Sequence, residues 1–167
     1  MTIGVLFVST GGICRAPMAA GVFRTFARRG RIEHLFDVDI AGTFDGHVGK
    51  APSLLTREVT ERRGYMLGAI KVRSLRPDDL ARYDHPIAMD RTNLAAMRWM
   101  APAGCTDRPQ LLMRHVHEAG ATDIVDPYGG VVADYERALD LIEQGCTGLM
   151  MNIVQALQKS WAPGPAG

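Results

Sequence analysis

The sequence is poor in cysteine and has no long apolar run, and each shortage excludes a class of protein. Its three cysteines, Cys14, Cys105 and Cys146, lie far apart without paired spacing. We therefore expect neither a disulfide framework nor a zinc site. The apolar run near the N-terminus covers only residues 3–8 and follows no basic segment, so it is too short for a signal peptide or a membrane span. These absences predict a reduced, cytoplasmic protein that crosses no membrane.

Net charge is also nearly absent. The 19 Lys and Arg residues almost balance the 18 Asp and Glu residues, which leaves a formal charge of +1. This balance argues against nucleic acid or an anionic membrane as the main partner. A chain of 167 residues that is 47% hydrophobic suits one domain. We expect that domain over residues 1–160, followed by a disordered tail over residues 161–167.

The sequence does contain an alternation of strand and helix patterns. Strands are expected near residues 3–8, 36–40, 86–89 and 110–113. Helices are expected from Ala16 to Gly30, from an N-cap at Ser53 to Gly64, after an N-cap at Asp90, and over a long amphipathic stretch from residue 131. This order predicts an α/β fold, a single domain with a four-stranded parallel sheet and helices on both faces. Ligands of such sheets bind beyond the carboxyl ends of the strands.

The segment that follows the first expected strand carries the strongest functional signal. It begins at Ser9, turns at Gly11 and Gly12, and reaches Arg15 just before Pro17, which suits the first turn of a helix. Backbone N–H groups and the positive end of the helix dipole would converge there, so an anion belongs at that point. Arg15 can hold an oxyanion with two parallel hydrogen bonds. We therefore expect phosphate or a phosphoester to bind residues Thr10, Gly11, Gly12, Ile13, Cys14 and Arg15.

The same segment resembles the catalytic loop of the low-molecular-weight protein tyrosine phosphatases. An active residue, five residues and an arginine form the signature of cysteine-dependent phosphatases, and here the spacing runs from Ser9 to Arg15. The flanking residues also match, and Asp126-Pro127-Tyr128 corresponds to the segment that supplies the general acid of that family. Further matching segments are residues 41–43, 47–49, 77–80 and 88–94. The resemblance covers roughly residues 3–158 and implies the Rossmann-like fold of that family.

The resemblance implies a two-step mechanism that needs no metal and no cofactor. A thiolate attacks phosphorus, while Asp126 first protonates the leaving oxygen and then activates water; Arg15 and the loop N–H groups hold the phosphoryl oxygens. Alternatives remain open for several residues. Asp126 could only form a turn, Tyr128 either lines the mouth of the site or only packs, and Cys14 is interpreted as a quiet loop thiol. Asp90 is expected to cap a helix and nothing more, and His47 to be structural.

Ser9 stands where the resemblance places the nucleophilic cysteine. A helix N-terminus can ionise a thiol, but a hydroxyl needs a positioned base, and no histidine is near Ser9 in the sequence. Ser9 could also be an ordinary strand-end residue that bonds a loop amide. Two functions therefore stay open. The first is a phosphatase-like protein that binds a phosphorylated protein or small molecule with hydrolysis lost or impaired. The second is an active cysteine-dependent tyrosine phosphatase represented by a Cys-to-Ser variant, with a thiol-dependent arsenate reductase a distant third.

Four further departures from the family pattern favour the first function. Gly12 replaces Asn, Ala16 replaces Ser, Ile40 replaces Ser and Ile70 replaces His, and the resemblance implies that those polar residues brace the loop. The usual aromatic wall falls at Gly46, with Phe44 two residues earlier, which weakens the expectation of phosphotyrosine specificity. The expected oligomeric state is a monomer or a weak homodimer.

Overall fold

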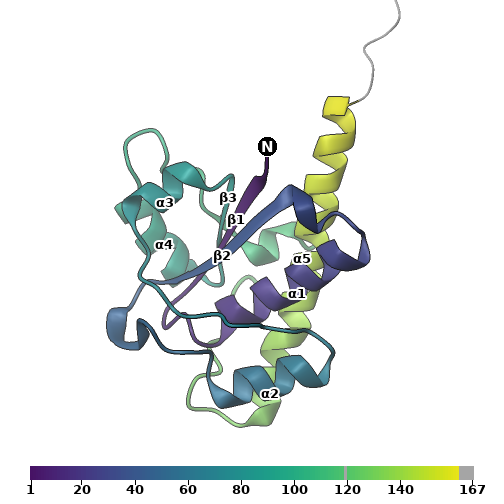
Figure 1. Ribbon diagram of the computed structural model, residues 1–167. Coiled ribbons are helices and arrows are strands. Elements are labelled where there is room, and N and C mark those ends of the chain that lie inside the picture. The colour runs from purple at the N-terminus through teal and green to yellow at the C-terminus, as the bar shows by residue number, and fades with distance from the viewer. Residues whose placement is uncertain (119, 162–167) are drawn as a thin grey trace, which may run out of the picture.

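A sheet of four parallel strands organises the protein, and the computed structural model describes residues 1–118 and 120–161 (Figure 1). The strands are β1 (Ile3–Ser9), β2 (Phe36–Gly42), β3 (His85–Ala88) and β4 (Gln110–Leu111), in the spatial order β2-β1-β3-β4. The α/β fold with a four-stranded parallel sheet is thereby confirmed. Because the strands are parallel, Ser9 pairs with Gly42 and Val8 pairs with Ala88 at the same edge of the sheet.

The side chains of β1 alternate between two buried layers. Val5 and Phe7 belong to the apolar cluster that contains side chains of α1 (Arg15–Arg29) and α5 (Val132–Trp161). Leu6 and Val8 belong to a second cluster with side chains of α3 (Pro77–Arg82) and α4 (Arg91–Met100). Figure 1 shows these two helix pairs on opposite sides of the sheet, while α2 (Leu54–Arg62) packs on α1 and α5. The period-two pattern of one strand therefore produces both layers.

The helix boundaries follow local signals in the sequence. The hydroxyl of Ser53 accepts a hydrogen bond from the N–H of Thr56 at the start of α2, and the carboxylate of Asp90 accepts one from the N–H of Asn93 at the start of α4. Both predicted N-caps are confirmed, as is the end of α1 immediately before Gly30. Three short 3₁₀ turns, η1 (Glu33–Leu35), η2 (Asp45–His47) and η3 (Leu112–His115), complete the secondary structure of the described residues.

The prediction for residues 110–113 was wrong beyond the first two residues, since β4 ends at Leu111. The fully buried Leu112 turns toward α5, where a Cβ at Gly145 would lie 2.5 Å from its Cγ. A Cβ at Gly148 would overlap the carbonyl oxygen of His115. Because both positions are glycine, η3 can pack closely against α5. This packing directs the chain away from the sheet after Leu111. The short helix α3 was not predicted.

The C-terminal boundary also differs slightly from the expectation. The helix α5 has 30 residues, about eight turns, and includes Trp161. Residue 161 therefore belongs to the helix rather than to the predicted tail, and residues 162–167 lie outside the described part of the chain. No helix of the described residues combines the length and the apolar character that crossing a membrane requires.

Candidate anion-binding site

The loop between β1 and α1 has carbonyl groups that accept hydrogen bonds and backbone N–H groups that find no acceptor among the described residues. The carbonyl oxygens of Ser9, Thr10 and Ile13 accept hydrogen bonds from the N–H groups of Thr43, Phe44 and Ser53, at 3.1, 2.9 and 2.9 Å. Within the described part of the chain, no hydrogen bond is donated by the backbone N–H groups of residues 11–15. The carbonyl groups of the loop are thus occupied on its outer side, and its donors are available to an anion.

Glycine is required at the centre of this loop. Gly12 has φ +69°, a conformation that favours glycine, and a Cβ at this position would lie 2.8 Å from Cγ1 of Val72. The loop backbone therefore packs directly against the segment that carries Val72. Gly12 stands where the family pattern has Asn, and the close approach of Val72 disfavours a side chain at this position.

Ser9 ends β1 at the base of the loop and is only 2% exposed. Its hydroxyl oxygen accepts a hydrogen bond from the N–H of Ala16 at 3.4 Å. This is the only hydrogen bond of that hydroxyl within residues 1–118 and 120–161, so no carboxylate or imidazole of these residues bonds it. The N–H group of a helix end can stabilise negative charge, but it cannot remove the hydroxyl proton.

Arg15 is 1% exposed and lies at the start of α1, with the two edges of its guanidinium in different environments. Its Nη1 donates to Oδ2 of Asp90 at 2.5 Å and to the carbonyl oxygen of Ile124 at 2.8 Å. Its Nη2 makes only long contacts, 3.4 Å to Oδ2 of Asp126 and 3.5 Å to Oγ1 of Thr10, and its Nε has no partner among the described residues. The Nε–Nη2 edge of a guanidinium has the geometry for two parallel hydrogen bonds to an oxyanion.

The expectation that Asp90 only caps a helix was wrong. One carboxylate oxygen caps α4 through the N–H of Asn93 at 2.7 Å, and the other holds Arg15. The side-chain amide of Asn93 is best satisfied with its nitrogen on Asp90 and its oxygen toward Thr10, each at 3.0 Å. A carboxylate has two oxygens with several acceptor positions, so one residue can end a helix and orient a guanidinium at the same time.

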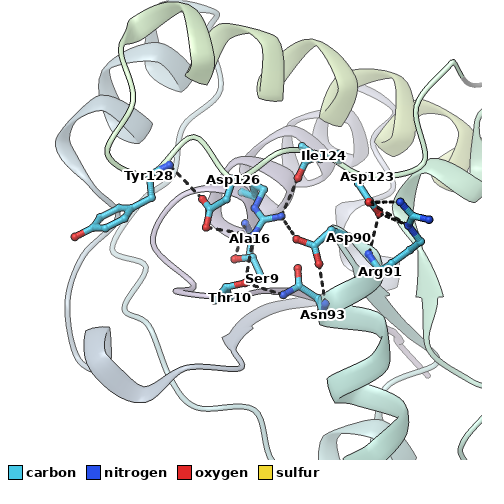
Figure 2. Close-up of polar contacts among 11 residues, drawn as sticks. Ser9, Thr10, Ala16, Asp90, Arg91, Asn93, Asp123, Ile124, Asp126 and Tyr128 are labelled. Atoms are coloured by element: carbon cyan, nitrogen blue, oxygen red, sulfur yellow. Dashed lines mark hydrogen bonds and ion pairs between the residues drawn. The ribbon is translucent and has the colours of Figure 1, made fainter.

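Asp126 forms a turn and also faces Arg15. Its Oδ1 accepts a hydrogen bond from the N–H of Tyr128 at 3.2 Å, which forms the turn, while its Oδ2 faces Nη2 of Arg15 (Figure 2). The side chain is 40% exposed, so it reaches both the site and the solvent. A carboxyl group in this position can donate a proton to, or accept one from, a group bound beside Arg15.

A cavity of about 140 Å³ brings the predicted site residues together. Its lining consists of residues 9–14 together with Asp126, Tyr128, Phe44 and His47. The ring centroids of Phe44 and His47 are 6.0 Å apart, and those of His47 and Tyr128 are 5.4 Å apart. Every predicted site residue except Arg15 lines this cavity. Arg15 is buried beside it.

Phe44 and His47 are the site residues that sequence reasoning missed. A Cβ at Gly46 would overlap the ring of Phe44, so glycine at that position allows the ring to fold back over the turn. His47 was expected to be structural, but its ring lies against Gly11 of the loop and lines the cavity. The position of these residues just after β2, at the carboxyl edge of the sheet, is the signal that could have identified them.

Cys14 belongs to the cavity lining, but its thiol contacts Ser53 and Tyr135. Its buried Sγ is 3.6 Å from Oγ of Ser53 and 3.8 Å from the hydroxyl of Tyr135. Burial raises the pKa of Tyr135 to about 12, with Cys14 acting in the same direction. Within residues 1–118 and 120–161, no three His, Cys, Asp or Glu side chains are grouped so that they could hold a metal ion.

Comparisons with known proteins agree with this geometry. Residues 4–161 match the family described as low molecular weight phosphotyrosine protein phosphatase. The chain is 34% identical over 156 residues to the low molecular weight protein-tyrosine-phosphatase YfkJ of Bacillus subtilis, which covers 93% of this chain and 99% of that protein. It is also 34% identical over 161 residues to the low molecular weight protein-tyrosine-phosphatase of Streptomyces coelicolor, with 95% and 98% covered.

A solved structure extends the similarity to three dimensions. The crystal structure of YfkJ from Bacillus subtilis superposes with a TM-score of 0.89 at 33% sequence identity, over 93% of this chain and 97% of that chain. The resemblance found in the sequence is thus confirmed over nearly the whole chain. A family match over residues 4–161 and relatives of similar length at 34% identity establish that the chain belongs to the low molecular weight phosphotyrosine protein phosphatase family.

Proposed function

We propose that this protein binds the phosphate group of a phosphotyrosine-containing partner in the loop from Ser9 to Arg15 and hydrolyses it slowly or not at all. The observation that carries the proposal is the free edge of Arg15. The Nη1 side of the guanidinium is held by Asp90 and Ile124, while Nε has no partner among the described residues and Nη2 makes only long contacts. A buried arginine with one free edge, beside unpaired loop N–H groups, is suited to an oxyanion.

The aromatic side chains around the cavity favour an aryl phosphoester. Phe44, His47 and Tyr128 form a chain of rings with centroid separations of 5.4–6.0 Å at the cavity wall. Flat apolar surfaces bind an aromatic ring through stacking or edge contacts. Gly46, at the usual position of the aromatic wall, weakened the expectation of phosphotyrosine specificity. The rings of Phe44 and His47 support that expectation, because both side chains line the cavity.

The impaired hydrolysis is inferred from Ser9 and its surroundings. In a cysteine enzyme the S–P bond forms as the P–O bond to the leaving group breaks, and the leaving oxygen receives a proton from an acid such as Asp126. The hydroxyl of Ser9 has no base as a hydrogen-bond partner in the described structure. Loss of the nucleophile in another nucleophilic enzyme lowers turnover by about a million-fold, and we expect a comparable loss here.

The four departures from the family pattern support the same inference. Ala16 and Ile40 are buried and apolar, Gly12 packs against Val72, and Ile70 packs against the core. None of these side chains can donate to or accept a hydrogen bond from the loop. The remaining polar brace of the loop therefore comes from Thr10, Asn93 and Asp90, which the sequence retains.

Titration with inorganic phosphate, monitored by thermal unfolding, tests the anion site. Phosphate should raise the melting temperature of the unaltered chain through binding to the native state. The Arg15→Ala variant should give no phosphate response, and Arg15→Lys should give a weaker one because an ammonium lacks the planar fork. Arg57→Ala, on the exposed face of α2, serves as the control and should respond like the unaltered chain. If phosphate raises the melting temperature of Arg15→Ala as much as that of the unaltered chain, Arg15 does not bind the phosphate.

Hydrolysis of an aryl phosphate by Ser9→Cys separates this proposal from the active-enzyme alternative. The alternative is a cysteine-dependent tyrosine phosphatase represented by a Cys-to-Ser variant, and the position of Asp126 opposite Arg15 favours it. We expect only slight recovery of turnover in Ser9→Cys, because the loop lacks the four polar residues. Strong recovery would mean that the remaining machinery is intact. Rapid, vanadate-sensitive phosphate release by the unaltered chain would overturn the proposal outright.

A further inference from the structure

Exposed apolar side chains are concentrated in two segments beside the anion-binding cavity. Twelve large apolar side chains are exposed in the described part of the chain, and six of them lie in segments 44–54 and 128–132. We name these six the apolar rim: Phe44, Val48, Leu54, Tyr128, Val131 and Val132. Single exposed apolar residues are common on soluble proteins, but a group at one place marks an interaction surface.

Hydrogen bonds anchor both segments of the apolar rim beside the loop. The N–H of Phe44 donates to the carbonyl oxygen of Thr10, and the N–H of Ser53, next to Leu54, donates to that of Ile13. On the other side, Tyr128 is held by Asp126 at the cavity. Figure 1 shows α2 beside the beginning of α5 at the lower end of the molecule. Phe44 and Tyr128 of the apolar rim line the cavity, and the other four side chains belong to the segments that continue from these two residues.

The cavity is too small to hold more than the end of a phosphorylated side chain. Its volume is about 140 Å³, whereas sites that enclose a whole drug-sized ligand measure about 300–1,000 Å³. A ligand whose phosphate reaches Arg15 must consequently leave its remaining atoms on the apolar rim. For a phosphotyrosine within a protein, those atoms are the backbone and the side chains on either side of the tyrosine.

The charges near the apolar rim indicate which flanking residues would be accepted. Segment 44–54 contains Asp45 and Lys50, and the turn that leads into α5 contains Asp126 and Asp134. The nearby Arg57 and Arg137 are paired with Glu61 and Asp134, and Asp45 and Asp126 outnumber Lys50. The two segments therefore offer no excess of positive charge to acidic flanking residues, and Asp126 would repel them. The exposed valines and leucine instead match apolar side chains, whose burial removes apolar area from water on both partners.

We propose that the apolar rim binds apolar residues that flank a phosphotyrosine in a partner protein, so that the preferred ligand is an apolar phosphotyrosine segment. This inference rests on the proposed function, because the phosphate must occupy the loop from Ser9 to Arg15. It adds a selectivity that the loop alone cannot supply, since the loop contacts only the phosphate and the cavity only the ring.

Binding of four synthetic ligands tests the proposal, measured by isothermal titration calorimetry on the unaltered chain. The ligands are N-acetyl phosphotyrosine amide and three pentapeptides with a central phosphotyrosine, flanked by leucines, by glycine and serine, or by glutamates. The leucine-flanked peptide should bind about tenfold more tightly than the glycine-serine peptide, a difference typical of a few well-placed apolar contacts. The glutamate-flanked peptide should bind no better than N-acetyl phosphotyrosine amide.

A double variant of the apolar rim, Leu54→Ser with Val131→Ser, sharpens the test. It should lose the roughly tenfold preference for leucine flanks but bind N-acetyl phosphotyrosine amide as the unaltered chain does, which also reports an intact cavity. The matched control is Met66→Ser with Trp99→Ser, since both side chains are strongly exposed but lie outside the two rim segments. It should keep the full preference.

The outcomes separate this inference from the proposed function. Equal binding of all three peptides, or an equal loss of preference in the control, would overturn the role of the apolar rim and leave the phosphate site standing. Failure of every ligand, including N-acetyl phosphotyrosine amide, would instead overturn the proposed function and this inference with it. A dimer in sedimentation that the double variant abolishes would assign the apolar rim to a second copy of the chain and overturn the proposal.

Discussion

Two arginines of this protein each lie between two aspartates, and they differ in how many of their donors are occupied. Arg73 donates through Nε to Asp39 at 2.9 Å, through Nη1 to Asp79 at 2.8 Å and through Nη2 to Asp79 at 3.2 Å. Arg15 is more deeply buried, yet its Nε has no partner among the described residues and its Nη2 makes only long contacts. Arg73 thus has every guanidinium nitrogen in a hydrogen bond of 3.2 Å or less, whereas the Nε–Nη2 edge of Arg15 is only weakly engaged by the described residues.

The difference separates an arginine that stabilises the fold from one that can bind a ligand. Arg73 joins Asp39 of β2 to Asp79 in the first turn of α3. Burial alone would lower the pKa of its guanidinium, but the hydrogen bonds to Asp79 and Asp39 raise it. At Arg15, Asp90 and the carbonyl group of Ile124 hold Nη1, while Nη2 faces Asp126 and Thr10, two residues that line the cavity. The two arginines thus differ in their expected roles because they differ in how many guanidinium donors are paired within the protein.

The largest effect predicted by this comparison is on folding. Replacement Arg73→Ala leaves Asp39 and Asp79 without their shared partner, and we expect the free energy of unfolding to fall by on the order of 2–3 kcal/mol. Urea denaturation measures the loss. Phosphate should still raise the melting temperature of this variant, because the anion site does not include Arg73. A folded Arg73→Ala protein without a phosphate response would contradict the division between the two arginines.

A smaller effect is expected at the free edge of Arg15. Oδ2 of Asp126 lies 3.4 Å from Nη2, where its negative charge competes with an anion for the guanidinium. The Asp126→Asn variant should therefore bind inorganic phosphate about three- to tenfold more tightly at low salt, with a smaller gain at high salt. Calorimetric titration measures both affinities. Asp79→Asn is the matched control on Arg73 and should reduce stability without changing phosphate affinity; weaker binding by Asp126→Asn would refute the competition.

The parts of the fold that depend on neighbouring residues could be predicted from the sequence. The strand β1, the loop with its glycines, and the caps at Ser53 and Asp90 all follow from patterns within a few residues. The failures at η3 and α3 have a different cause. The strand β4 ends where Leu112 packs against Gly145 on α5, and no pattern in the neighbouring residues predicts that contact.

The same distinction applies to the candidate site. Ser9, Arg15 and Asp126 were found because they lie in motifs, and the structure brings them together. The second role of Asp90 was missed because its contact with Arg15 joins residues 75 positions apart. The role of Asp90 as a helix N-cap was sufficient to explain an aspartate at this position, so the sequence did not indicate that its carboxylate also contacts Arg15. His47 was missed for a similar reason, since its place beside Gly11 depends on how the turn after β2 folds back over the loop.

The smallest predicted effect concerns acid and again distinguishes the two arginines. Burial opposes ionisation of Asp39, but the N–H of Ile40 and the hydrogen bond from Arg73 outweigh it and lower the pKa of the carboxyl below its ordinary value of 3.8. The folded state therefore binds the Asp39 proton less tightly than the unfolded state does. The stability gained from this carboxylate is fully present above the ordinary pKa and is lost as the pH falls through the folded one.

Arg73→Ala removes part of this lowering, so the difference in unfolding free energy between the unaltered chain and the variant should shrink between about pH 5 and about pH 2. Urea denaturation at a series of pH values measures the difference directly. Arg57→Ala, which removes an exposed ion pair, is the control and should show a small difference that changes little with pH. A difference that stays constant for Arg73→Ala would mean that Arg73 stabilises the fold through packing of its side chain rather than through the charges of its two aspartates.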